Sequence, residues 1–182
     1  MDIIKGKPGA AKGFSTLTFN LRFGLADDGA NRWDHRKKGL STLFKKYHPD
    51  FISLQEVNDF QIDYLATVLI GYEFIGKHSP APPNWQNNVI FFKSKWAPIV
   101  YRHLFLSQTP TIPSKFRDSR WPRQCTMGMF TSNGRNLICI NTHFDFAENV
   151  QTNSAVLIME HLSKLPSNVP AILLGDFNAT PN

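Results

Sequence analysis

Hydrophobic and polar positions along the chain form short segments whose spacing predicts strands mixed with helices. β-favouring residues alternate with polar ones over 15–22, which predicts a strand. Apolar positions recur at roughly helical spacing over 32–47 and 58–69, with charged or polar residues between them. The continuous apolar run at 50–56, bounded by turn residues, is typical of a buried strand, and the apolar run at 170–174 predicts a last strand.

The remaining segments extend this pattern. Further strands are predicted over 72–77, 88–93 and 99–106, a hairpin over 124–132 and 135–144, and a helix over 149–164. In this last helix the expected apolar members are Val156, Leu157, Met159, Leu162 and Leu165. Asn133 and Gly134 between the two hairpin runs indicate a tight turn. Hairpins mixed with helices predict an α/β sandwich, in which two largely antiparallel sheets pack together with helices outside.

The chain divides into a short arm and one domain. Residues 1–13 are rich in Gly, Lys and Ala and are expected to form a flexible arm, followed by a single domain over 14–182. Two segments, the proline-rich 78–86 and the polar 107–123, predict long loops. Loops of this length within a compact domain are usually functional or disordered, so we expect them to determine specificity.

Composition narrows the class of protein. With 42% hydrophobic and 19% charged residues among 182, the chain can bury the core of an ordinary globular domain. It shows no apolar stretch typical of a signal peptide or a membrane span, so we expect a cytoplasmic protein. Two cysteines do not make a disulfide framework, and Cys139 within an apolar run is expected to be a buried thiol. The formal net charge of +6 fits an anionic partner, such as nucleic acid, a phosphorylated small molecule or lipid headgroups, or an ordinary solvated surface.

Polar side chains stand at the ends of four apolar strands, where a core residue could have continued. They are Asn20, Glu56, His143 with Asp145, and Asp176 with Asn178. Each alone has an ordinary explanation, such as a polar strand end, a satisfied buried histidine or a turn-forming aspartate. Strand ends along one edge of a sandwich converge on a common rim, and such rims hold catalytic groups. Taken together, these residues therefore favour an active site.

The residue types in this set indicate a magnesium site, with Mn²⁺ as the alternative ion. Carboxylate and amide oxygens are hard ligands that suit either cation. Zinc would favour His and Cys, and neither cysteine has a partner at zinc spacing. A histidine beside such a site can donate to a phosphate oxygen or transfer a proton near neutral pH. No G-x-G-x-x-G fingerprint and no phosphate-binding P-loop occur, which counts against a nucleotide-binding fold.

Four strings in a fixed order give a more specific signal: TFNLRF, SLQEV, INTHFD and LLGDFNATP. Together, over residues 15–182, they resemble the signature of the endonuclease/exonuclease/phosphatase superfamily, to which deoxyribonuclease I belongs. The segment FLSQTP, followed by Arg120 and Arg123, resembles a bacterial subgroup of that superfamily. The resemblance implies a four-layer α-β-β-α sandwich of the deoxyribonuclease I type and a Mg²⁺-dependent hydrolase of phosphoester bonds.

The resemblance also implies roles at the metal and the water. Glu56 would be the principal metal carboxylate, with Asn20 beside it as a ligand or as an amide that orients the ligand. Asp176 would orient or deprotonate the attacking water, and His143 would stabilise or protonate a phosphoryl oxygen. The reaction would be in-line attack of water on phosphorus.

Three further residues are implied to face the phosphate. Asn178 would bind it and also hold Asp176, Arg123 would bind a phosphate oxygen, and Asn88 would face the same cleft. These roles predict a phosphodiesterase or nuclease acting on DNA, RNA or another phosphodiester. A phosphomonoesterase or a sphingomyelinase-type lipid phosphodiesterase would use the same centre. A non-catalytic module that binds nucleic acid through its phosphates is an alternative from a different class.

The sequence departs from the family pattern at its end. The family carries a further strand and a Ser-Asp-His motif after the GDFN string, and no Ser-Asp-His occurs in these 182 residues. We therefore expect a truncated domain that lacks its last strands. We also expect the 182-residue fragment to be weakly stable and nearly inactive alone.

Overall fold

The computed structural model describes residues 13–180, so the predicted arm over 1–13 lies almost wholly outside the described residues. The elements are β1 (Thr16–Asn20), a 3-10 turn (Gly29–Asn31), α1 (Trp33–Tyr47), β2 (Phe51–Val57), α2 (Asp59–Val68), β3 (Tyr72–Ile75), β4 (Asn87–Lys93), β5 (Ala97–Phe105), β6 (Gln124–Ser132), β7 (Arg135–His143), α3 (Glu148–Leu162) and β8 (Ala171–Asp176). Every predicted helix and strand is present, with its ends shifted by at most two residues.

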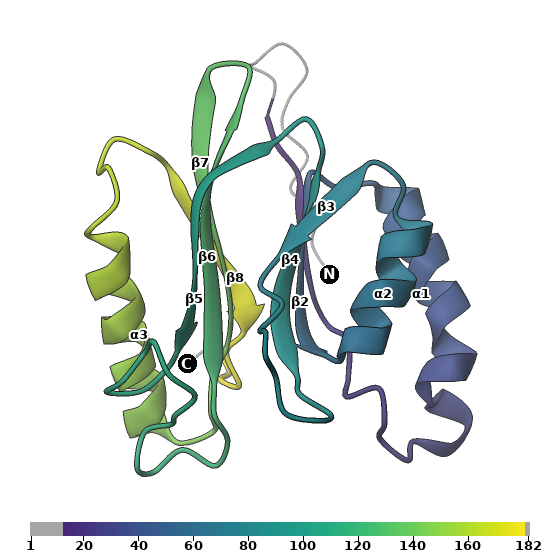
Figure 1. The fold of residues 1–182 in the computed structure, drawn as a ribbon, viewed down its shortest axis with the longest axis horizontal. Coiled ribbons are helices and arrows are strands. Elements are labelled where there is room, and N and C mark those ends of the chain that lie inside the picture. Colours follow the sequence, from purple (N-terminus) through teal and green to yellow (C-terminus); the bar gives the residue numbers. More distant parts are fainter. Residues whose placement is uncertain (1–12, 181–182) are drawn as a thin grey trace.

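The strands form two sheets that face each other (Figure 1). The first sheet has the order β1-β2-β4-β3 and the second the order β5-β6-β7-β8. The pairs β1–β2 and β7–β8 are parallel, and the other pairs are antiparallel. Helices α1 and α2 cover the outer face of the first sheet, and α3 covers the outer face of the second. The predicted α-β-β-α sandwich of mainly antiparallel sheets is thus confirmed.

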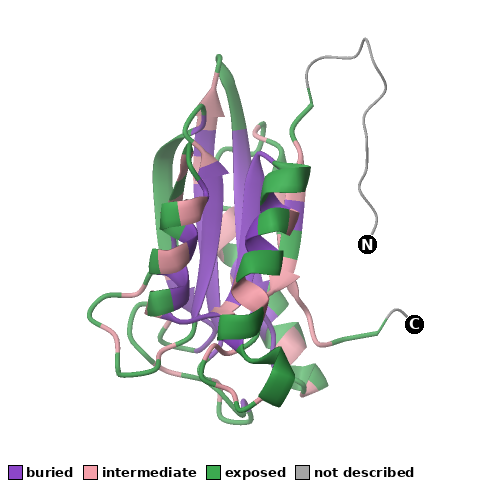
Figure 2. Cartoon of the chain, turned by 90° about the vertical axis from the view of Figure 1, so that its right-hand side faces the viewer, coloured by how far each residue is buried: buried purple, intermediate pink, exposed green. Residues whose placement is uncertain are grey.

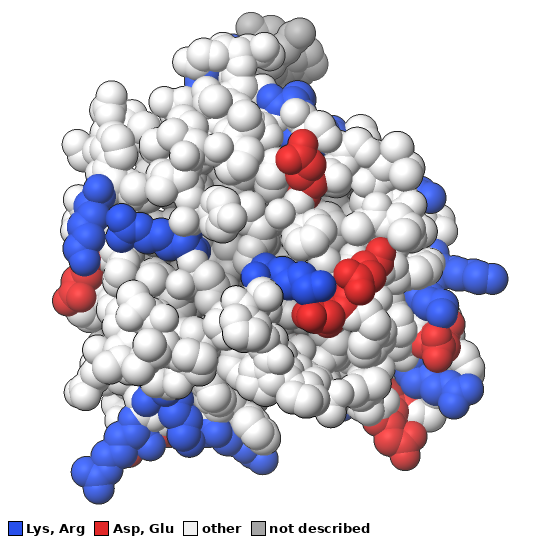
Figure 3. All heavy atoms as spheres, viewed as in Figure 1, with Lys and Arg blue, Asp and Glu red and all other residues white. Residues whose placement is uncertain are grey.

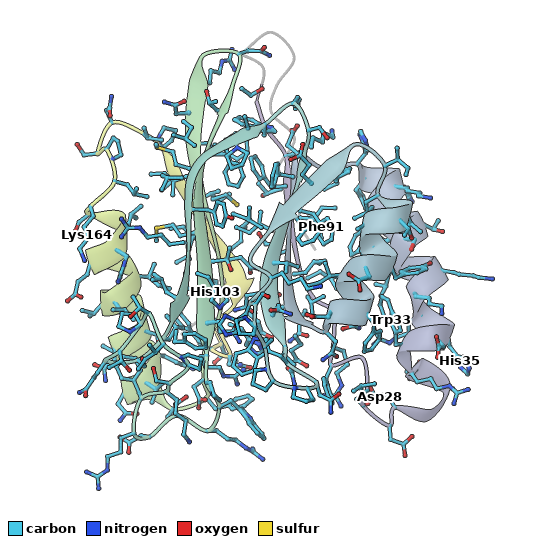
Figure 4. All side chains as sticks on the ribbon, in the orientation of Figure 1. Asp28, Trp33, His35, Phe91, His103 and Lys164 are labelled. Carbon is cyan, nitrogen blue, oxygen red and sulfur yellow. The ribbon has the colours of Figure 1, made fainter. Side chains whose placement is uncertain are left out.

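Apolar side chains pack between the two sheets and between each sheet and its helices, and Figure 2 shows buried strands at the centre of the molecule. Between the sheets, Phe130 packs against Phe51 and Phe92, with ring centroids 5.0 and 4.9 Å apart. Trp33 and Phe91, labelled in Figure 4, belong to the layer between the first sheet and its helices. A core on both faces makes each sheet a rigid platform, which holds its strand ends in fixed positions.

The buried face of α3 differs from the sequence-based prediction. Of the apolar members named from the sequence, Leu157, Leu162 and Leu165 pack against the core, but Val156 and Met159 are 52% and 60% exposed. The buried residues are instead Val150, Ser154 and Ile158, which follow one another at intervals of four. Side chains four apart lie on one face of a helix, so a small serine can lie against the sheet while apolar neighbours point outward.

The two cysteines are buried in β6 and β7 and form no disulfide. Burial raises the pKa of the Cys139 thiol to about 12, so this thiol stays protonated at neutral pH. The expected buried thiol is therefore confirmed. Within residues 13–180, no helix is both long and apolar enough to cross a membrane.

Candidate active site

The ends of β1, β2, β7 and β8 meet at the lower edge of the sandwich in Figure 1, and a cleft of about 730 Å³ opens there. The sequence-predicted site residues that line it are Asn20, Glu56, Asn88, Arg123, His143, Asp176 and Asn178. They come from positions up to 158 residues apart in the chain, from Asn20 to Asn178. The structure thus places all of them in one cleft, and Asp145 lies behind it.

Glu56 reaches the cleft because β2 is irregular at this point. The pairing of β2 with β4 shifts register between Leu54 and Val57, and Glu56 has a φ of 60°. Such left-handed backbone is uncommon outside glycine and costs about 1–3 kcal/mol, which the surrounding structure must offset. The Glu56 carboxylate accepts hydrogen bonds from Asn20 Nδ2 at 2.9 Å and from the Phe23 backbone N–H at 2.9 Å.

Asn20 links the two acidic residues of the cleft. Its Nδ2 donates to Glu56 Oε1 at 2.9 Å and to Asp176 Oδ2 at 3.0 Å. Its Oδ1 accepts the backbone N–H of Arg22 at 2.9 Å, which fixes the orientation of the amide. Because the nitrogen faces the carboxylates, this geometry favours the ligand-orienting role for Asn20 over direct metal ligation.

Asp176 is placed by the tight packing of β8 against β7. The preceding Gly175 has a φ of 155°, and a Cβ there would lie 2.2 Å from the carbonyl oxygen of Thr142. Only glycine allows this approach, which sets Asp176 opposite His143 in the register of the two strands. The Nε2 of His143 lies 3.9 Å from Asp176 Oδ2.

Asn178 holds Asp176 from the following turn. Its backbone N–H donates to Asp176 Oδ1 at 3.0 Å, and its side-chain Nδ2 donates to the Phe144 carbonyl at 2.8 Å. Burial of Asp176 favours its neutral form, but the hydrogen bonds from Asn20 and Asn178 outweigh this and lower its pKa. Asp176 is therefore a carboxylate at neutral pH, able to accept a proton or orient a water.

His143 is buried at the floor of the cleft. Burial lowers the pKa of His143, and the positive charge of Arg123 adds to this effect, while Asp176 and Glu56 oppose it. The balance favours the neutral imidazole near pH 7. A neutral histidine keeps one N–H to donate, which suits a hydrogen bond to a phosphate oxygen.

Arg123 lines the cleft and forms an ion pair with the buried Asp145 behind it. Its Nε donates to Asp145 Oδ2 at 3.3 Å, and the two residues are 8% and 2% exposed. The same oxygen accepts Ser119 Oγ and the backbone N–H groups of Arg120 and Trp121. Burial opposes the charged form of Asp145, but these hydrogen bonds prevail and lower its pKa. Asp145 therefore ties the last part of the 107–123 loop to the cleft.

Replacing Asp145 by Ala is expected to lower the free energy of unfolding by about 3 kcal/mol, because Arg123 would stay buried without its partner. Asp118→Ala, which removes an exposed carboxylate of the same loop, is the control and should cost much less. Because the pKa of Asp145 is depressed in the folded state, its stabilisation is lost as the pH falls through that pKa. Urea unfolding at several pH values tests this: the difference between wild type and Asp145→Ala should shrink in acid, and a constant difference would contradict it.

Several cleft residues were not identified from the sequence. Trp85, Trp121 and Phe146 line the cleft, as does Arg22, which pairs with Asp28 at 2.9 Å. Trp85 and Trp121 lie in the two loops predicted to determine specificity, whereas Phe146 follows β7 and had no signal in the sequence. The cationic groups of Arg120 and Arg123 lie 5.5 and 5.6 Å from the rings of Trp121 and Phe146.

Trp85 is held against the cleft by a stack of rings from β5 and the 78–86 loop. His78 lies 5.5 Å from Trp85 and stacks on His103 with ring centroids 5.4 Å apart, and Phe105 contacts both His78 and Trp85. Burial, reinforced by the neighbouring His78, lowers the pKa of His103 to about 4, so this ring is neutral at physiological pH. The stack therefore behaves as packing that supports one wall of the cleft.

Basic residues lie in the loop beside the cleft, and one of them, Arg120, lines it. On the face shown in Figure 3, Lys and Arg side chains gather at the lower left, where the loop between β5 and β6 lies in Figure 1. This loop carries the exposed residues Lys115, Arg117 and Arg120. An anionic substrate would be attracted to this side of the molecule.

The acidic part of the cleft fits a magnesium ion better than a zinc ion. Among residues 13–180, no three His, Cys, Asp or Glu side chains converge on a common point that could hold a metal. Mg²⁺ commonly takes one or two protein carboxylates and keeps several waters, so it does not need such a cluster. The group that joins Glu56 and Asp176 is the neutral amide of Asn20, so two carboxyl groups lie close together at the edge of the cleft.

The sandwich and the acidic cleft at its edge define a protein of the deoxyribonuclease I-like class. The chain belongs to the endonuclease/exonuclease/phosphatase family, whose model matches residues 17–182.

Solved structures agree with this assignment. The mannosyl-6-phosphatase Bt3783 of Bacteroides thetaiotaomicron is 28% identical with a TM-score of 0.86, and the match covers 93% of this chain and 67% of that one. A family protein from Bacteroides vulgatus is 25% identical with a TM-score of 0.83, covering 91% and 65%. D. rerio TDP2 complexed with a single-strand DNA product shares the fold at 19% identity and a TM-score of 0.70, covering 91% and 60%. The chain thus spans about two thirds of the length of these proteins. No curated protein sequence matches it.

Proposed function

We propose that the protein is a Mg²⁺-dependent hydrolase of phosphoester bonds whose centre consists of Glu56, Asn20, Asp176, Asn178 and His143. One observation carries the proposal: the amide of Asn20 joins the carboxylates of Glu56 and Asp176, at 2.9 and 3.0 Å, at the edge of a cleft. The family match supports phosphoester hydrolysis in general. The requirement for a metal and the role of each residue are part of this proposal.

Different residues of the centre would bind the metal, orient the water and contact the phosphate. Glu56 would hold Mg²⁺, with Asn20 fixing the orientation of its carboxylate. When bound, the metal would neutralise charge that develops on the phosphoryl oxygens. Asp176 would orient the attacking water and accept its proton, because its low pKa keeps it ionised.

The phosphate would lie between His143, Asn178 and Arg123. His143 would donate from its N–H to a phosphoryl oxygen, and the buried guanidinium of Arg123 would supply a fixed positive charge beside it. The backbone of Asn178 already holds Asp176, so the turn that carries Asn178 would align water and phosphate together. Preorganised donors of this kind need no rearrangement as the reaction proceeds.

The first candidate substrate is a phosphodiester such as DNA or RNA, which the basic loop at the cleft mouth favours. A phosphomonoester of a small hydroxylated molecule is the second candidate. It is favoured by the cleft volume of about 730 Å³ with aromatic walls and by the similarity to a protein named a mannosyl-6-phosphatase. Both substrates would use the same centre, since the centre contacts only the phosphate.

Rates with bis(p-nitrophenyl) phosphate, p-nitrophenyl phosphate and mannose 6-phosphate, each with Mg²⁺ and with EDTA, test the proposal and separate the two substrates. Hydrolysis that requires Mg²⁺ supports the shared centre, and the ratio of kcat/KM values selects the substrate class. If the full-length protein hydrolyses none of these esters and binds DNA with an affinity that falls steeply with salt, the non-catalytic alternative is correct.

A further inference from the structure

Two buried amides lie directly behind the proposed centre and take no part in the chemistry described above. Gln55 on β2 is 1% exposed, and Asn141 on β7 is 0% exposed. They belong to the SLQEV and INTHFD strings, one residue before Glu56 and two residues before His143. Buried amides are costly unless their hydrogen bonds are satisfied, so their partners indicate what they hold together.

The two amides join the sheets through the sandwich interior. Gln55 Nε2 donates to Asn141 Oδ1 at 2.6 Å, and also to Thr18 Oγ1 and the Ser53 carbonyl at 3.2 Å each. Asn141 Nδ2 donates to the carbonyl oxygens of Leu54 and Val89 at 2.8 Å each. Asn141, which lies in the second sheet, thus bonds to both neighbouring strands β2 and β4 of the first.

The two carbonyls that accept hydrogen bonds from Asn141 lie where the pairing of β2 with β4 becomes irregular. Leu54 and Val89 form the last regular pair between β2 and β4 before the register shifts. The next two residues of β2 are Gln55 and Glu56, and Glu56 has the left-handed φ of 60° that turns its carboxylate into the cleft. Asn141 therefore fixes the two strands at the point where the irregularity begins.

The contacts of Asn141 also affect the position of His143, which lies on the same strand. In a strand, residues two apart point to the same face, so Asn141 and His143 both face the first sheet. The contact between Asn141 and the start of the irregular segment therefore fixes the position of β7 relative to Glu56. It also fixes the distance between His143 and the carboxylates of the cleft.

We propose that Asn141, supported by Gln55, is a positioning residue that holds the irregular segment of β2 so that Glu56 presents its carboxylate to the metal beside His143. The proposal rests on the proposed function. It adds that metal affinity is governed by an amide from the opposite sheet, which contacts neither metal nor substrate.

Asn141→Leu in the protein tests this, because leucine has a similar volume but no amide. Residues that orient metal ligands typically change metal affinity by about 10–100-fold. We therefore expect the Kd for Mn²⁺, measured by isothermal titration, to rise at least about tenfold. At saturating metal, KM for the phosphoester should be little changed while kcat falls, since the phosphate contacts remain.

A matched control separates positioning from general destabilisation. Tyr72→Phe removes a hydrogen bond of the same sheet, from the Tyr72 hydroxyl to the Pro49 carbonyl, at the opposite end of β2. It should lower Tm while leaving Mn²⁺ affinity unchanged. If Asn141→Leu does not fold, the Gln55→Met variant tests the proposal instead. This variant removes the hydrogen bond from Gln55 to Asn141 but leaves the two hydrogen bonds from Asn141 to the carbonyls. The expected result there is a smaller rise in Kd, of about threefold or more.

The outcomes are distinct. A weakened Mn²⁺ affinity in the folded variants, beyond that of Tyr72→Phe, supports the proposal. Unchanged Mn²⁺ affinity in the folded variants overturns it while leaving the proposed function intact. A full-length wild-type protein that neither binds Mn²⁺ nor hydrolyses a phosphoester contradicts the proposed function itself.

Discussion

Replacing Asp176 by Asn is expected to reduce phosphoester hydrolysis by about 1,000-fold or more, with the fold retained. The amide has the shape of the carboxylate but cannot accept a proton from water, and a positioned general base contributes about 100- to 10,000-fold. The low pKa of Asp176 means that the carboxylate form is the active one. The hydrogen bond from the Asn178 backbone can still form, so the turn should keep its conformation.

Initial rates at saturating Mg²⁺ provide the measurement, with Tm as the check on folding. Asp63→Asn is a suitable control, because Asp63 is exposed on α2 and lies outside the cleft. It should leave the rate within about twofold, as expected for an exposed surface substitution. Near wild-type hydrolysis by Asp176→Asn would mean that the water is activated elsewhere.

Replacing Glu56 by Gln is expected to have the second large effect, on metal binding. The glutamine oxygen can still accept the hydrogen bond from the Phe23 backbone N–H, but the glutamine amide nitrogen then faces Asn20 Nδ2, so the hydrogen bond from Asn20 is lost. The substitution removes the negative charge, and Mg²⁺ and Mn²⁺ bind carboxylates far better than neutral amides. We expect Mn²⁺ affinity to fall more than about 100-fold, beyond the range for residues that only orient a ligand.

Isothermal titration or the Mn²⁺ resonance signal gives this affinity directly. Glu73→Gln is the matched control: it makes the same chemical change on an exposed position of the same sheet. Retention of tight Mn²⁺ binding by Glu56→Gln would transfer the principal metal role to another residue, with Asp176 as the first to examine.

The elements and their arrangement could be predicted because the hydrophobic spacing is strong. The continuous apolar run at 50–56 marks the strand β2, which is almost wholly buried, and Asn133 with Gly134 marks the hairpin of β6 and β7. The strand ends of two packed sheets lie at a common edge. The positions at strand ends therefore predict the convergence of Asn20, Glu56, His143 and Asp176. The order of the four sequence strings supplied the family.

The internal geometry of the site could not be predicted in the same way. Nothing in the sequence indicates that Asn20 turns its nitrogen toward two carboxylates, or that a backbone N–H from Phe23 holds Glu56. Such contacts depend on loop conformation and on the register of strands distant in sequence. The partner of Arg123 is a similar case, since Asp145 lies 22 positions away and meets it only in the folded loop.

The face of α3 shows a different limit. Apolar residues occur on more than one side of this helix, so spacing alone could not decide which side packs on the sheet. The structure selects the side with Val150, Ser154 and Ile158, and Leu157, Leu162 and Leu165 pack partly against the same core.

Crystals of the protein soaked with Mn²⁺ and inorganic phosphate, examined by anomalous diffraction, would test the central claim most directly. We predict one strong anomalous peak within ligand distance of the Glu56 carboxylate, about 2.0–2.4 Å for a hard divalent cation bound by oxygen. The phosphate should lie beside it, within hydrogen-bonding distance of His143 or Asn178. A peak elsewhere, or none in this cleft at millimolar Mn²⁺, would contradict the proposed centre.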